Sequence, residues 1–160
     1  MLRPGRRLSI DVGQARIGLA ISDIHAILAS PLTTISRSDD LENSVEEVLN
    51  TGLAEGELLE IYIGIPLNLK GASTLSTQDA LSFAEIVAAK TKVEVLLIDE
   101  RLTTSLANQQ LKQIGKSQRD ARSTIDQMAA VAILEYAFQV ESNTGKRPGF
   151  TLEEWRLAND

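Results

Sequence analysis

The sequence predicts an α/β domain, in which a mixed five-stranded sheet of one antiparallel hairpin and parallel strands carries helices on both faces. Alternating apolar and polar residues on both sides of a short turn within 6–20 are typical of a hairpin. Two later apolar runs, 58–65 and 93–98, each follow a helical pattern. Such strand–helix–strand units make parallel neighbours joined by right-handed crossovers. The chain has 160 residues, which suits a single domain with one core.

The first half of the chain supplies the hairpin, an edge strand, a helix and a buried strand. A third strand is expected within 27–35, and Pro31 predicts that it is an edge or broken strand, because proline has no N–H to donate to a ladder. Helically spaced apolar residues then predict a helix that begins at Asp39 and stops near Gly52. The run 58–65 is apolar and β-branched, as in a buried strand.

The second half adds helices around one more strand. Ser76 with Asp79 three residues later is a capping pattern, which predicts the start of a helix with an apolar face. The strand 93–98 follows this helix. A further helix is expected over about 103–114, capped by one of two threonines.

The last long helix is expected to start near Ser123. It belongs inside the fold, because the stretch 128–138 contains a single charged residue. We therefore divide the chain into a domain at 1–140 and a C-terminal tail at 141–160. The tail is expected to be flexible apart from a short helical piece around Trp155.

Composition excludes several kinds of chemistry. The chain has no cysteine and one histidine, so disulfides, thiolate catalysis and cysteine-bound zinc are excluded. The formal net charge of −6 argues against a protein coated in basic surface, but it leaves room for nucleic acid at a local basic site. No apolar run approaches the ~20 residues of a membrane span. We therefore expect a cytoplasmic protein with no membrane contact.

Three acids stand out by their context. Asp11 lies in the first strand, where the backbone holds a carboxylate rigidly, and Glu100 emerges at the carboxyl end of the last parallel strand. Asp126 is expected in the first turn of the apolar helix, in the direction of apolar residues, where a carboxylate is costly unless it is paired or bound to metal. Each acid also has a plain structural interpretation: the start of a turn, the polar end of a strand and a helix cap, respectively.

Convergence of the three acids predicts a metal site. The binding crevice of such a sheet lies beyond the carboxyl ends of its parallel strands. Carboxylates without cysteine make a hard-oxygen site that suits Mg²⁺ or Mn²⁺. Two such ions roughly 3.5–4 Å apart can activate a water and stabilise the leaving oxygen of a phosphodiester.

Several motifs occur in an order that resembles one family. They are Asp11-Val12-Gly13 with Arg16-Ile17-Gly18 and Ser22-Asp23, Ala29-Ser30-Pro31-Leu32, Gly64-Ile65-Pro66-Leu67-Asn68, Asp99-Glu100-Arg101-Leu102-Thr103-Thr104, and Ile125-Asp126-Gln127-Met128-Ala129-Ala130. Over about residues 6–139 the chain resembles the YqgF/RuvX family, Holliday-junction-resolvase-like proteins described as pre-16S rRNA nucleases. The resemblance implies an RNase H-like fold at 1–140, and Asp11, Glu100 and Asp126 match the family's acidic triad. Lys70 departs from the family, which usually has an acid there.

The resemblance implies a metal-dependent nuclease that processes the 5′ end of precursor 16S rRNA in ribosome biogenesis. Its partners would be structured RNA, including pre-ribosomal particles, and its cofactor would be Mg²⁺ or Mn²⁺. We expect a monomer or weak dimer, because no surface stripe in the sequence demands a dimer. A resolvase of branched DNA on the same site is an alternative, as is an RNA-binding assembly or regulatory factor that does not cleave. An actin-like ATPase shares the Asp-x-Gly hairpin, but that fold normally needs two such domains.

Four residues are candidates for nucleic-acid binding. Arg16 and Arg101 each lie close in sequence to one of the acids, and Lys70 and Asn68 lie in the loop after the strand 58–65. Asn68 either binds the substrate or closes a turn. Further cations that could approach the strand edge are Lys112, Lys116, Arg119 and Arg122. For Lys112 and Arg119, solvated surface is the simpler interpretation.

Overall fold

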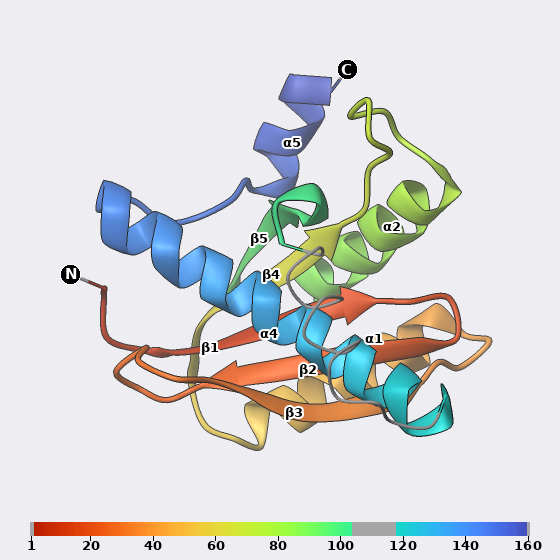
Figure 1. The fold of residues 1–160 in the computed structure, drawn as a ribbon, viewed down its shortest axis with the longest axis horizontal. Helices are drawn as coiled ribbons and strands as arrows, with labels where there is room; N and C mark the ends of the chain where they lie inside the picture. Colours follow the sequence, from red (N-terminus) through yellow and green to blue (C-terminus); the bar gives the residue numbers. More distant parts are fainter. Residues whose placement is uncertain (1, 104–117, 160) are drawn as a thin grey trace.

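A mixed five-stranded sheet forms the centre of the molecule, in strand order β3-β2-β1-β4-β5 (Figure 1). The computed structural model describes residues 2–103 and 118–159, with side chains for 2–103 and 125–159. The hairpin strands β1 and β2 and the edge strand β3 are antiparallel, whereas β4 lies parallel to both β1 and β5. The strands are β1 Arg6–Val12, β2 Arg16–Ser22, β3 Ala29–Ser36, β4 Leu58–Ile65 and β5 Glu94–Asp99. The predicted fold class is therefore confirmed.

Helices cover both faces of the sheet and divide the core into two layers. The helices α1 (Leu41–Leu53) and α2 (Leu75–Lys90) pack on one face, where Leu8 and Ile10 of β1 are fully buried. The long helix α4 (Gln118–Thr144) crosses the other face over β1 to β4 (Figure 1). The polar side of β1 is therefore buried as well, and the hydroxyl of Ser9 donates to the carbonyl of Ala130 in α4 at 2.6 Å.

The edge position of β3 follows from its proline. Pro31 pairs with Ala20 of β2 and Thr33 pairs with Leu19, so the register shifts by one residue directly after the proline, which lacks an N–H. This agrees with the expected edge strand.

Two helix starts differ from the predicted ones by one or two residues. The side chain of Asp40, not Asp39, caps α1 by accepting from the N–H of Glu42. Thr74 begins α2 through a capping box with Thr77, instead of the pattern at Ser76 and Asp79. The helix expected over 103–114 lies almost wholly outside the described residues.

The C-terminal segment is packed against the sheet, whereas we expected a flexible tail. Helix α4 continues to Thr144, so the proposed division at residue 140 falls inside it. Phe150 exchanges two backbone hydrogen bonds with Leu97 of β5, and Trp155 of α5 (Leu152–Asn159) is 7% exposed within the core. The helix around Trp155 was expected, but its burial supplies the free energy that orders the segment. Among the described residues, no helix is long and apolar enough to cross a membrane.

Candidate active site

Asp11 lies at the carboxyl end of β1 between two strands that carry glycine at the same level. Gly18 of β2 is its register partner. On the other side, the pairing of Ile10 with Ile63 places Gly64 of β4 next to Asp11, one position further along. Neither neighbour has a side chain, so the sheet leaves space on both sides of Asp11.

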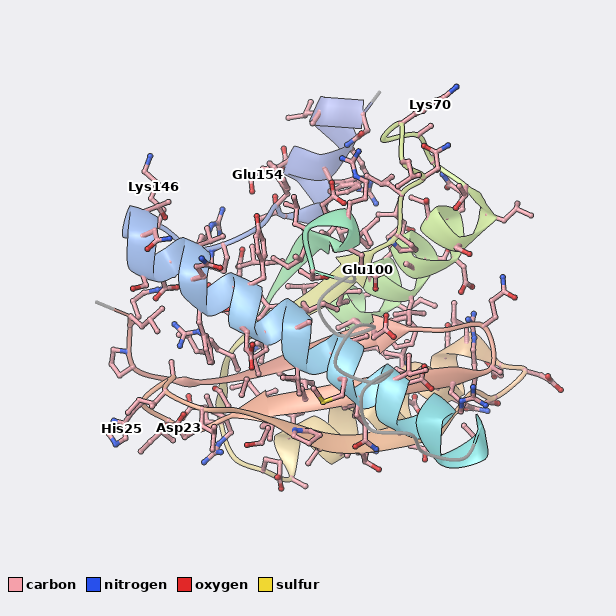
Figure 2. All side chains as sticks on the ribbon, viewed as in Figure 1. Asp23, His25, Lys70, Glu100, Lys146 and Glu154 are labelled. Atoms are coloured by element: carbon pink, nitrogen blue, oxygen red, sulfur yellow. The ribbon has the colours of Figure 1, made fainter. Side chains whose placement is uncertain are left out.

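The other two acids fill this space. A Cβ atom at Gly64 would lie 2.6 Å from Oε1 of Glu100, which follows β5 in the short 3₁₀ helix η1 (Glu100–Leu102). A Cβ atom at Gly18 would lie 2.1 Å from the carbonyl oxygen of Asp126 and 3.0 Å from its Cβ. Figure 2 places Glu100 near the carboxyl ends of β1 and β4, beside α4. Strands and helix thus bring Asp11, Glu100 and Asp126 together.

The electrostatics of Asp11 reflect this crowding. Burial raises the pKa of the Asp11 carboxyl well above its ordinary value. A hydrogen bond with the Glu100 side chain raises it further, as does repulsion from the charges of Glu100 and Asp126. Three half-buried carboxylates that lie close together favour whatever supplies positive charge there, either a proton or a cation.

Asp126 has a different position in its helix from the expected one. Because α4 already runs from Gln118, Asp126 lies two turns inside the helix and not in its first turn. The interpretation of Asp126 as a helix cap is therefore wrong. Its carboxylate Oδ2 instead accepts from Nε of Arg16 at 3.0 Å.

The three acids suit a hard divalent cation by their donor chemistry, since carboxylate oxygens are the ligands that Mg²⁺ and Mn²⁺ prefer. Within the described part of the chain, however, no three acidic or histidine side chains are oriented around one metal position. Arg16 holds the carboxylate of Asp126, and Asp11 is hydrogen-bonded to Glu100. The acids fit the cation in chemistry and proximity, and their side chains must turn to bind it.

Besides Arg16, two of the candidate nucleic-acid-binding residues are bonded to other groups of the protein, and one projects into solvent. Arg101 pairs with Asp99, with Nη2 and Oδ2 2.6 Å apart, and lies against Gly71 of the loop after β4. Asn68 closes that loop, because its side-chain oxygen accepts from the N–H groups of Lys70 and Ala72. The Lys70 side chain projects into solvent from the same loop (Figure 2). The side chains of Lys112, Lys116, Arg119 and Arg122 lie outside the described residues.

One ion pair near the site was not found from the sequence. The guanidinium of Arg37, just after β3, pairs through both of its Nη atoms with Asp79 of α2, at 2.6 and 2.5 Å. Arg37 also donates to the carbonyl of Gly13 at 2.9 Å, and its N–H donates to the carbonyl of Ala15. These bonds hold the turn between Asp11 and Arg16. No local pattern could have indicated a pair 42 residues apart.

The fold and the three acids define an RNase H-like α/β domain with a carboxylate site, and structural comparison agrees with this class. A RuvC structure from Thermus thermophilus has a TM-score of 0.50 at 17% identity, over 87% of this chain and 97% of that one. The nuclease domain of the human cytomegalovirus terminase also has a TM-score of 0.50, at 12% identity over 83% of each chain.

Sequence comparison identifies the family. The profile of the RuvX family, described as Holliday junction resolvase, matches residues 5–140, and the chain belongs to this family. A protein of Clavibacter sepedonicus named "Putative pre-16S rRNA nuclease" is 41% identical over 159 residues, covering 99% of this chain and 98% of its own length. A protein of Mycobacterium bovis with the same name is 46% identical over 132 residues, covering 82% of this chain and 76% of its own.

Proposed function

We propose that this protein is a metal-dependent nuclease that hydrolyses phosphodiester bonds in structured RNA, and that its substrate is precursor 16S rRNA. The names of its relatives support the substrate. The observation that supports the chemistry most directly is the convergence of Asp11, Glu100 and Asp126 across two glycines. Pre-ribosomal particles in the cytoplasm would then be its partners.

In this proposal the three acids hold Mg²⁺ or Mn²⁺, and each acid is carried by a different element of the fold. Asp11 is the central ligand, fixed on the middle strand of the sheet. Glu100 approaches Asp11 from η1, at the carboxyl end of β5, and Asp126 approaches it from α4. The chemistry supplied at such a site is activation of a water for attack on phosphorus and stabilisation of charge on the leaving oxygen.

The residues around the acids would bind the substrate backbone. Lys70 is the most accessible candidate, since its side chain projects from the loop that Asn68 closes. Arg101 faces the same loop at Gly71 and is 37% exposed despite its pair with Asp99. A phosphate would have to compete with Asp99 for this guanidinium. A phosphate that binds Arg16 would likewise have to compete with Asp126, with which Arg16 is paired.

The test is cleavage of an RNA that carries the 5′ leader of 16S rRNA, in Mg²⁺ or in Mn²⁺, by the full chain. Asp11→Asn, Glu100→Gln and Asp126→Asn are each expected to abolish cleavage while the protein stays folded. Glu135→Gln is the matched control, because Glu135 is an exposed acid on the same helix as Asp126. Cleavage by Asp11→Asn at the rate of the original protein would refute the proposal.

A second candidate is resolution of four-way DNA junctions, which the description of the matching family favours. The same preparation is therefore incubated with a synthetic junction. Symmetric nicking of the junction, with the RNA left intact, would replace RNA by branched DNA as the substrate. Binding of the RNA without products in either metal would indicate an assembly or regulatory factor.

A further inference from the structure

The ion pair between Arg16 and Asp126 lies inside the candidate metal site. Nε of Arg16 is 3.0 Å from Oδ2 of Asp126, and the two side chains are 37% and 17% exposed. Asp126 is thus held by a cation that belongs to the chain. An oxygen that accepts from a guanidinium has one lone pair fewer for a metal, and its orientation is fixed by that bond.

The backbone of Arg16 is fixed, whereas its side chain has an exit to solvent. The carbonyl of Arg16 accepts from the N–H of Gly13 at 2.9 Å, and Arg16 pairs with Ser36 across β2 and β3. Two residues further along β2, Gly18 lies under the backbone of Asp126. The distance between the two backbones is therefore set by the sheet and α4. Rotation of the long, partly exposed arginine side chain can release the carboxylate without moving either backbone.

We propose that Arg16 is an internal counter-ion that competes with a divalent cation for Asp126, and so sets the cation affinity of the site. This inference rests on the proposed metal-dependent function. Arg16 holds the carboxylate in place when no cation is bound, and it must leave when one binds. A released guanidinium is then exposed at the edge of the site, where it can contact a substrate phosphate. Cation binding and substrate binding would therefore favour each other through this one side chain.

The test measures the affinity of the full chain for Mn²⁺ without substrate, by titration calorimetry or from the electron paramagnetic resonance of free Mn²⁺. Arg16→Gln removes the competing charge. Arg101→Gln is the matched control, since Arg101 is also 37% exposed and also paired with an acid, but with Asp99 outside the cluster. Both variants lose one positive charge near the site. Their difference therefore isolates the direct competition at Asp126.

Arg16→Gln is expected to bind Mn²⁺ about two- to fivefold more tightly than Arg101→Gln, the range for loss of a partly exposed ion pair. Arg16→Lys is expected to lie between Arg16→Gln and the original protein, because an ammonium keeps the charge but loses the planar Nε donor. It serves as the second variant should Arg16→Gln not fold. The inference would be overturned if Arg16→Gln bound Mn²⁺ no more tightly than Arg101→Gln, or if Arg16→Lys bound it no more tightly than the original protein.

The original protein and Asp11→Asn separate this inference from the proposed function. If the original protein binds Mn²⁺ and Asp11→Asn does not, the metal site stands, whatever the Arg16 variants do. If the two bind Mn²⁺ equally, the metal site itself is refuted and the role of Arg16 with it.

Discussion

Gly64→Ala tests whether the missing side chain beside Asp11 is what admits Glu100. The new Cβ would lie 2.6 Å from Oε1 of Glu100 and 2.6 Å from Cδ1 of Ile133, whereas ordinary contacts begin at 3.4 Å. Glu100 must therefore retreat by about 0.8 Å, which exceeds the ~0.5 Å within which a site has to be held. A misplacement of this size can lower the cleavage rate by up to about 100-fold. Overpacking against Ile133 should cost about 1–3 kcal/mol of stability.

The assay compares cleavage and Mn²⁺ affinity with the melting temperature in the same preparations. Gly52→Ala is the control, because its Cβ would also lie 2.6 Å from a side-chain carbon, Cδ2 of Leu8, but on the face of β1 away from the acids. Both variants are overpacked, and only Gly64→Ala displaces a carboxylate. If folded Gly64→Ala cleaved RNA and bound Mn²⁺ like Gly52→Ala, the placement of Glu100 over Gly64 would not matter for the reaction.

Three further predictions follow from other contacts. The pKa of Asp11 is raised in the folded protein, so its carboxylate costs stability as the pH rises above the ordinary value of 3.8. At pH 7 without metal, Asp11→Asn should therefore melt at a higher temperature than the original chain, and the difference in melting temperature should shrink in acid. Arg37→Gln and Asp79→Asn should each slow cleavage, and the double variant should be no slower than either, with a coupling of about 1 kcal/mol in a double-mutant cycle of kcat/KM. Glu141→Gln should lower the free energy of unfolding in urea by about 3 kcal/mol, since the buried guanidinium of Arg7 loses its carboxylate partner at 3.0 Å and is left with Glu60 at 4.0 Å. Glu94→Gln, in an exposed pair, should change it by less than about 1 kcal/mol.

The sheet was predictable because its signals are local and strong. Alternation identified the hairpin, the apolar run 58–65 matches β4 at both ends, and Pro31 placed β3 at an edge. The proximity of Asp11 and Glu100 followed from topology, because carboxyl ends of parallel strands meet at one edge. What alternation does not show is whether a polar face is covered. Arg7, on the polar side of β1, is fully buried under α4.

The helix starts and the pairs between distant residues were not predictable in the same way. Ser76 and Thr74 both begin local patterns of capping residues, and the choice between them depends on packing, since Thr77 also donates to the carbonyl of Pro66. The sequence around Asp79 contains no pattern that would indicate its pairing with Arg37, 42 residues away. For Asp126, the serine and threonine before it resembled a cap, although the helix starts earlier.

Helix α4 connects two fixed points of the molecule. Near the end of the helix, the carboxylate of Glu141 accepts from Arg3, just before β1, at 2.6 Å, and from Arg7, in β1, at 3.0 Å. Asp126 lies 15 residues earlier, or about 22 Å along the axis at 1.5 Å per residue. The length of the helix therefore fixes the distance between Glu141 and Asp126. A single residue inserted between them would turn Asp126 by about 100° away from the sheet, so the length of this helix is as strict a requirement as the identity of the acid it carries.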